Sequence, residues 1–145
     1  MDSSASTFLA MSANQQRVVH LRLLERAVSV WEEHYPPNSC PTYQETVTGT
    51  IQELDVGLPR EALTAIHKLC DLANIAGRYR EPIVALQDDD LELPDPVEFA
   101  YYAVYNAFRL HVLGRDIDPW LVVNQALSAV GLEQASTVLD AAITG

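Results

Sequence analysis

The sequence has two cysteines, no long apolar run and few basic residues in its second half, and each shortage excludes a class of protein. Cys40 and Cys70 are too few for a disulfide framework, so we expect free thiols, Cys70 in the core and Cys40 partly exposed. No apolar segment approaches the roughly 20 residues of a membrane-spanning helix. The N-terminal MDSSASTFLAMSANQQ lacks the basic and long apolar regions of a secretory signal. The sequence therefore predicts a cytoplasmic protein.

Motifs for catalysis or metal binding are also missing. The chain contains no P-loop, no His-Glu-x-x-His and no Gly-x-Ser-x-Gly. His67 and Cys70 could share one helical face, but a zinc site would need His34 and Cys40 to complete it. The acidic DDDLELPDP lacks the ligand spacing and central glycine of a calcium-binding loop. We therefore expect no cofactor, no metal and no catalytic residue, and a protein that is not an enzyme.

Apolar residues recur mostly at helical spacing. They make up 48% of the chain, enough for a folded core, and they fall three and four positions apart in several segments. No segment alternates apolar and polar residues in the manner of a strand. This pattern predicts an all-α fold, a single-domain compact bundle of six or seven helices over residues 15–145, with residues 1–14 as a flexible N-terminal tail. The helices that we expect cover residues 15–35, 42–55, 59–77, 82–87, 96–113, 119–130 and 132–143.

Two Asp-Pro pairs predict helix starts. Asp95 would be an N-cap, with Pro96 in the first helical position and Glu98 in the third. The same pattern recurs at Asp118-Pro119. A capping box, Thr42 with Glu45, would open the helix over residues 42–55.

The formal net charge of −11 is unevenly distributed. Residues 1–80 carry seven basic and nine acidic residues, whereas residues 81–145 carry two basic and eleven acidic residues. A negative field of this kind repels nucleic acid and anionic membrane and attracts basic proteins. We therefore expect a partner with a basic surface, and neither nucleic acid nor membrane. The same acidity also serves solubility alone.

The acids are densest in residues 81–98, which hold seven acidic residues and no Lys or Arg. This segment has two interpretations, a solvated linker or an electronegative surface that docks a basic partner. The helix that follows is rich in aromatic residues, and its tyrosines could fill the core or reach the surface beside the acids. On the second interpretation the candidate partner-binding residues are Asp88, Asp89, Asp90, Glu92, Asp95, Tyr101 and Tyr102.

Two amides lie within strongly apolar helices. Asn106 and Asn124 would each need a hydrogen-bond partner if buried, because an unsatisfied amide costs about 1–3 kcal/mol. They could form a structural pair or hydrogen-bond to a loop carbonyl, or they could line a small-molecule pocket together with Trp120.

The stretches EFAYYAVYNAFRLHVLG and DIDPWLVVNQALSA resemble segments of small all-helical immunity proteins from bacterial polymorphic-toxin loci. The resemblance covers residues 81–130. It implies binding and stoichiometric occlusion of a cognate toxin, such as a nuclease with a basic active-site cleft. The alternatives are an acidic adaptor or regulatory module, or a small-molecule-binding protein or enzyme. The sequence leaves the toxin and the oligomeric state open.

Overall fold

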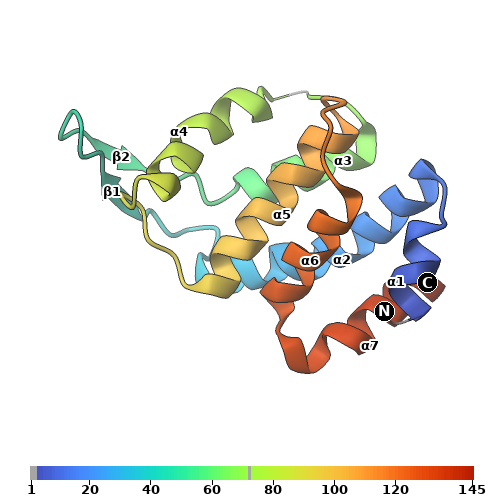
Figure 1. Cartoon of the computed structure of the whole chain (residues 1–145). Coiled ribbons are helices and arrows are strands. Elements are labelled where there is room, and N and C mark those ends of the chain that lie inside the picture. The colour runs from blue at the N-terminus through green and yellow to red at the C-terminus, as the bar shows by residue number, and fades with distance from the viewer. Residues whose placement is uncertain (1–2, 72) are drawn as a thin grey trace.

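In the computed structural model, which describes residues 3–71 and 73–145, one long helix runs through the middle of the molecule with other helices around it (Figure 1). The described residues form seven helices and one two-stranded hairpin, which confirms the expected all-α bundle. The elements are α1 (Ser3–Leu9), α2 (Ala13–His34), β1 (Thr42–Gln44), β2 (Ile51–Glu53), α3 (Leu58–Lys68), α4 (Ile75–Gln87), α5 (Asp95–His111), α6 (Pro119–Val130) and α7 (Leu132–Thr144).

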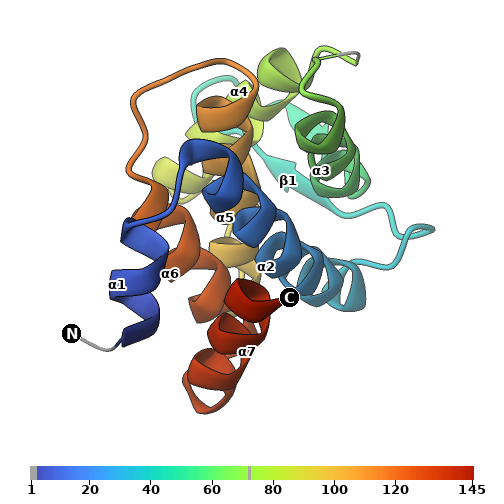
Figure 2. The ribbon, with the colours of Figure 1, turned by 90° about the vertical axis from the view of Figure 1, so that its right-hand side faces the viewer.

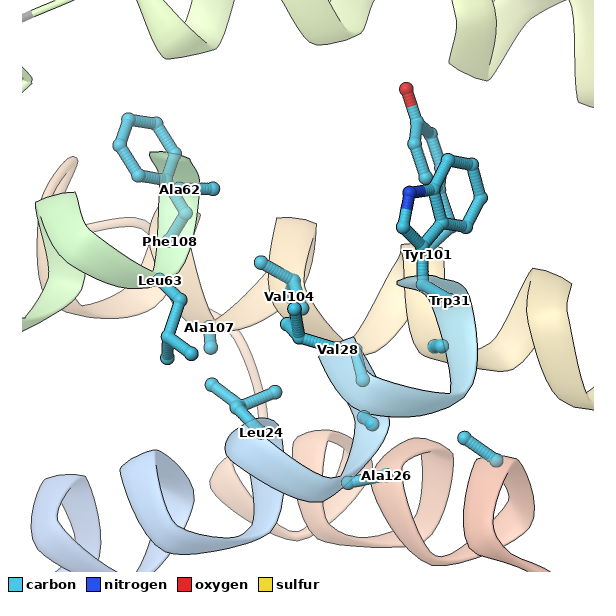
Figure 3. Close-up of a cluster of buried hydrophobic side chains, with 14 of the residues drawn as sticks. Leu24, Val28, Trp31, Ala62, Leu63, Tyr101, Val104, Ala107, Phe108 and Ala126 are labelled. Atoms are coloured by element: carbon cyan, nitrogen blue, oxygen red, sulfur yellow. The ribbon is translucent and has the colours of Figure 1, made fainter. Parts of the chain in front are cut away.

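The central helix is α5, and it packs against α2, α3 and α6. Its buried residues fall on several faces, so no single neighbour could cover them. Alanines at 100, 103 and 107 are almost fully buried and let the neighbouring backbones approach closely. Figure 3 shows Val104 and Ala107 of α5 beside Val28 and Leu24 of α2.

Aromatic side chains close one end of this core. The ring centroids of Trp31 on α2 and Tyr101 on α5 lie 4.7 Å apart, and both side chains are fully buried (Figure 3). The indole N–H of Trp31 donates to the carbonyl of Val56 at 2.8 Å, which ties the chain before α3 to α2. Tyr79 of α4 lies against Tyr101, with centroids 4.9 Å apart.

From Ser3 onward the N-terminal segment packs against the core, contrary to the flexible tail expected over residues 1–14, of which residues 1–2 lie outside the described residues. Residues Ser3–Leu9 form α1, and Phe8 is fully buried, with its ring 5.4 Å from that of His20. Ser12 then caps α2 through a capping box with Gln15. The expectation was wrong because a seven-residue helix has little stability of its own, and only burial of Phe8 against other elements holds it.

The helix expected over residues 42–55 is wrong, and so is its capping box at Thr42. This segment forms an antiparallel hairpin in which Tyr43 pairs with Gln52. Gly49, at φ +69, turns the connecting loop, and its N–H donates to the Glu45 carbonyl at 2.8 Å. The β-branched residues between these strands disfavour a helix, and glycine supplies the left-handed turn that a hairpin needs.

A further correction concerns residues 59–87. The helix expected to continue to residue 77 ends at Lys68, and Leu69 (φ +54) and Asn74 (φ +53) bound the break. The next helix begins at Ile75 and carries Pro82 in its interior, not at its start. Buried residues on both sides of the proline, among them Tyr79 and Ile83, hold this helix against the core. Tertiary burial here outweighs the loss of one helical hydrogen bond.

The two cysteines are both free and exposed. The exposure of Cys40 agrees with its expected place in a loop. Cys70 was expected in the core, and this expectation is wrong because α3 ends before it reaches that residue.

Two histidines join α2, α5 and the start of α6. His20 is fully buried, and its Nδ1 lies 2.8 Å from Nε2 of His111, while its Nε2 lies 2.9 Å from the Pro119 carbonyl. A carbonyl only accepts, so His20 Nε2 carries the proton and donates it. Because the neutral ring carries only one N–H, the Nδ1 of His20 accepts from His111 Nε2–H, which requires His20 to be neutral. Burial lowers the pKa of His20 to about 4.

The pKa of His111 is lowered as well. Burial, His20 and Arg17 together lower its pKa to about 4. Both groups are thus harder to protonate in the folded chain than in the unfolded chain. Their contribution to stability is complete above about pH 6.5 and is lost as the pH falls from there toward about 4.

We expect the free energy of unfolding to fall by about 2 kcal/mol from His20 alone between about pH 7.5 and about pH 5. Urea unfolding at the two pH values measures this loss. His111→Gln preserves a donor at the position of Nε2 and removes one titrating ring, so its loss should be smaller than that of the wild type. The control His67→Gln replaces an exposed histidine and should behave as the wild type. Equal losses in the wild type and His111→Gln would contradict the assignment of His111.

Candidate partner-binding site

The connection between α4 and α5 is not a free linker. Leu91 and Leu93 are buried in the core, whereas Glu92 between them is exposed. Because the two leucines point into the core, the Glu92 side chain between them points toward solvent. The segment passes beside the β1–β2 hairpin (Figure 1).

Three aspartates turn the chain at the end of α4. Asp88 is the C-cap residue of α4, and Asp89 adopts a left-handed conformation with φ +60, which aspartate tolerates better than most residues. Both are exposed. Asp90 is half-buried, and its carboxylate accepts from the hydroxyl of Thr46 and, at 3.2 Å, from its N–H. Asp88, Asp89 and Glu92 are therefore open to a partner, and Asp90 also holds the hairpin.

Asp95 does not cap α5 as expected. The helix begins one residue earlier, because the N–H of Glu98 donates to the Pro94 carbonyl at 2.9 Å, and no side chain caps it. Asp95 and Glu98 both lie in the first turn, with the Asp95 side chain exposed. At the other Asp-Pro pair the expectation is confirmed, since Asp118 accepts from the N–H of Trp120 at 2.9 Å.

The acids of this segment repel one another. Partial burial, followed by the charges of Asp95 and Asp89, raises the pKa of Glu98. Partial burial and the charge of Asp90 raise the pKa of Glu81. Burial is the larger cause in both cases, and repulsion from other acids of the segment adds to it.

Two arginines of the neighbouring helices pair with acids outside this segment. Arg60 of α3 pairs with Glu25 at 2.6 Å and with Glu32 at 2.7 Å, and both of these acids lie on α2. Arg78 of α4 pairs with Glu61 and Asp55. Among the described residues, no ion pair involves an acid between positions 81 and 98.

The two candidate tyrosines occupy different places. Tyr101 is fully buried in the core, so its assignment to the partner-binding surface is wrong. Its neighbour on the helix, Tyr102, is half-buried, and burial followed by the charge of Glu98 raises its pKa. A shift of one residue turns the side chain by about 100° around a helix, which separates core from surface here.

Tyr102 lines a surface pocket of about 370 Å³ together with Asp95, Glu98, Phe99 and Gln125. Phe99 is 40% exposed. Phe99 and Gln125 are not among the site residues expected from the sequence. The spacing of residues 95, 98, 99 and 102 places them on one helical face, a signal that points to Phe99. Gln125 comes from α6, and no local pattern links it to this face.

The two asparagines do not form a pair. Asn106 is buried and donates through Nδ2 to Oε1 of Gln125 at 2.8 Å, while Arg109 donates to its Oδ1 at 3.3 Å. Asn124 is exposed. The hypothesis of a pocket lined by Asn106, Asn124 and Trp120 is therefore not supported. Asn106 instead fixes Gln125 at the wall of the Tyr102 pocket.

The described part of the chain shows neither a cluster of metal ligands nor a membrane-spanning helix. No three His, Cys, Asp or Glu side chains there gather closely enough to hold a metal ion. Among the described helices, none has both the length and the apolar character required to cross a membrane. Comparison with protein-family models, curated proteins and solved structures gave no match for this chain.

The hydroxyl of Tyr101 is buried and has no hydrogen-bond partner in the described structure. An unsatisfied buried hydroxyl is unfavourable, so removing it releases that penalty. We expect Tyr101→Phe to unfold at the same or a higher urea concentration than the wild type. A fall in the midpoint would show that the hydroxyl is hydrogen-bonded, for example to a water molecule.

Glu98 should destabilise the fold at neutral pH. Its raised pKa means that its contribution to stability is present below the unfolded-state pKa and is lost as the pH rises through the folded-state value. We therefore expect Glu98→Gln to raise the urea midpoint at about pH 7, and added salt to reduce the difference. Glu133→Gln, in the exposed first turn of α7, is the matched control. A lower midpoint for Glu98→Gln than for this control would contradict the predicted repulsion.

Proposed function

We propose that this protein binds and neutralises a protein partner with a basic surface, in the manner of an immunity protein that occludes the active site of a cognate toxin. The observation that carries this proposal is the uncompensated acidic surface formed by residues 88–98. Its acids lie beside two aromatic side chains, and no basic residue of the chain pairs with them within the described structure. Aromatic side chains are enriched in protein interfaces, and acidic groups beside them steer a basic partner toward the surface.

The energetic state of this surface supports the proposal. Partial burial, and after it repulsion from neighbouring acids, raises the pKa of Glu81 and of Glu98, so the free chain holds these charges at an unfavourable free energy. A basic partner would relieve that repulsion, which adds to the affinity of the complex. Residues that lower stability without a local benefit are commonly retained for function.

A nuclease toxin would suit this surface. Its substrate cleft must attract phosphate groups and is therefore basic. Carboxylates presented by residues 88–95 could take the places of phosphates and block access to the cleft. Complementary charge also accelerates encounter, which is valuable where free toxin is harmful.

Co-expression with the product of the gene adjacent to its own tests this proposal. If that product is the toxin, the chain should restore growth and co-purify with the product in a one-to-one complex. Growth inhibition that persists despite co-expression, with no complex formed, would remove the support for this function.

The charges can be tested separately in that complex. The triple variant Asp88→Asn, Asp89→Asn, Glu92→Gln neutralises the three most open acids, and asparagine preserves the left-handed turn at position 89. We expect its association rate at low salt to fall by about threefold to tenfold, with a weaker salt dependence, because electrostatic steering is lost. Stopped-flow fluorescence measures both quantities.

The control variant for this measurement carries the same change in net charge at exposed sites away from the segment, namely Glu33→Gln, Asp116→Asn and Glu133→Gln. It should associate almost as fast as the wild type. Equal slowing in the two triple variants would assign the effect to net charge and not to residues 88–92.

A further inference from the structure

The pocket at the start of α5 combines carboxylates with aromatic rings. Asp95 and Glu98 supply the charge, Phe99 and Tyr102 supply ring faces, and Gln125 forms the wall on the side of α6. Its volume of about 370 Å³ lies near the lower limit for small-molecule sites, which suits one side chain better than a cofactor. None of the residues lining it is basic, so the chain does not neutralise its own pocket.

A second contact on the same helix shows that a half-buried tyrosine of α5 can hold a guanidinium. The Cζ atom of Arg109 lies over the ring of Tyr105, 5.1 Å from its centroid. Tyr105 is one turn from Tyr102 and is likewise half-buried. Among the described residues no cation lies over Tyr102 in this way, although acids stand beside it.

We propose that this pocket receives an arginine side chain of the protein partner, with its guanidinium against Tyr102 and Phe99 and paired with the carboxylates of Asp95 and Glu98. This inference rests on the proposed function and identifies the anchor of that interface. Arginine fits better than lysine because its planar guanidinium both stacks on aromatic rings and bonds carboxylates through two N–H groups. It is also less strongly hydrated than an ammonium group and so enters a partly apolar pocket at lower cost.

The position of Gln125 favours the same ligand. Its Oε1 accepts from Asn106 at 2.8 Å, which fixes the side chain and leaves the second lone pair of that oxygen as a further acceptor. A guanidinium carries only donors, so an acceptor here adds to its binding. A calcium ion would need six to eight oxygen ligands, and aromatic rings occupy part of this pocket instead.

Binding of a model side chain tests the proposal without the partner. The probe is N-acetyl-arginine methylamide, titrated into the ¹⁵N-labelled full chain and followed by amide chemical shifts. We expect saturable shifts in the first two turns of α5 and at Gln125. N-acetyl-citrulline methylamide, a neutral isostere, should cause none over the same range, and the lysine analogue should bind more weakly than the arginine compound.

Variants locate the site. Glu98→Gln and Phe99→Ala should each weaken binding of the arginine probe by about tenfold, because one removes a charged partner and the other a stacking face. Glu133→Gln should bind as the wild type. Glu98→Gln is expected to be more stable than the wild type, so unfolding would not explain its weaker binding.

Several results would overturn the proposal. These are shifts that do not saturate, shifts spread over all exposed acids, equal binding of the citrulline or lysine compound, and displacement of the arginine probe by calcium chloride.

The outcomes also separate this proposal from the proposed function. Rescue of growth by Glu98→Gln and Phe99→Ala as efficient as that by the wild type, with arginine binding lost, would reject the anchor alone. A chain that binds the arginine probe but neither rescues growth nor binds the adjacent product would reject the proposed toxin and leave the pocket assigned.

Discussion

Burial of α5 from several sides is the constraint on which the rest of this structure depends. This helix carries apolar or aromatic residues over most of its circumference, so α2, α3 and α6 must all pack against it. Its first turn, however, carries Asp95 and Glu98, which water must solvate. The start of α5 therefore lies at the edge of the bundle, and the acidic segment that precedes it lies there too. The acidic surface is in this sense a consequence of how the core is closed.

Within the described structure, the distribution of ion pairs leaves the acids at that edge without basic partners. Arg60 and Arg78 each pair with two carboxylates and thereby join α3 to α2 and α4 to α3. These ion pairs hold the two arginines at places away from residues 88–98, where they stabilise the packing of the helices. The acids of the segment consequently keep their mutual repulsion, which adds to partial burial in raising the pKa of Glu98. A partner that supplies positive charge would then gain from a strain that the free chain carries.

Much of the fold follows from patterns within single segments. Apolar spacing predicts α2, α5, α6 and α7, and the Asp118-Pro119 pair predicts the start of α6, which the structure confirms. Local patterns failed where partners distant in the sequence decide the outcome. Residues 42–55 form a hairpin whose loop is held by Asp90, and α1 persists through burial of Phe8. Among the candidate site residues, the exposure of Asp88, Asp89 and Glu92 follows from their acidic, turn-forming sequence, whereas the burial of Tyr101 depends on how the helices pack.

The sequence by itself determined the helical content, the concentration of seven acids in residues 81–98 and the absence of basic residues among them. Only the tertiary structure decided that Tyr102 and not Tyr101 faces outward, that Gln125 of α6 completes the pocket, and that His20 pairs with His111. The physical reason is the distance along the chain over which each interaction acts. Helix propensity and charge density act between neighbours in the chain, whereas a pocket or a buried hydrogen bond joins groups that meet only when separate helices pack.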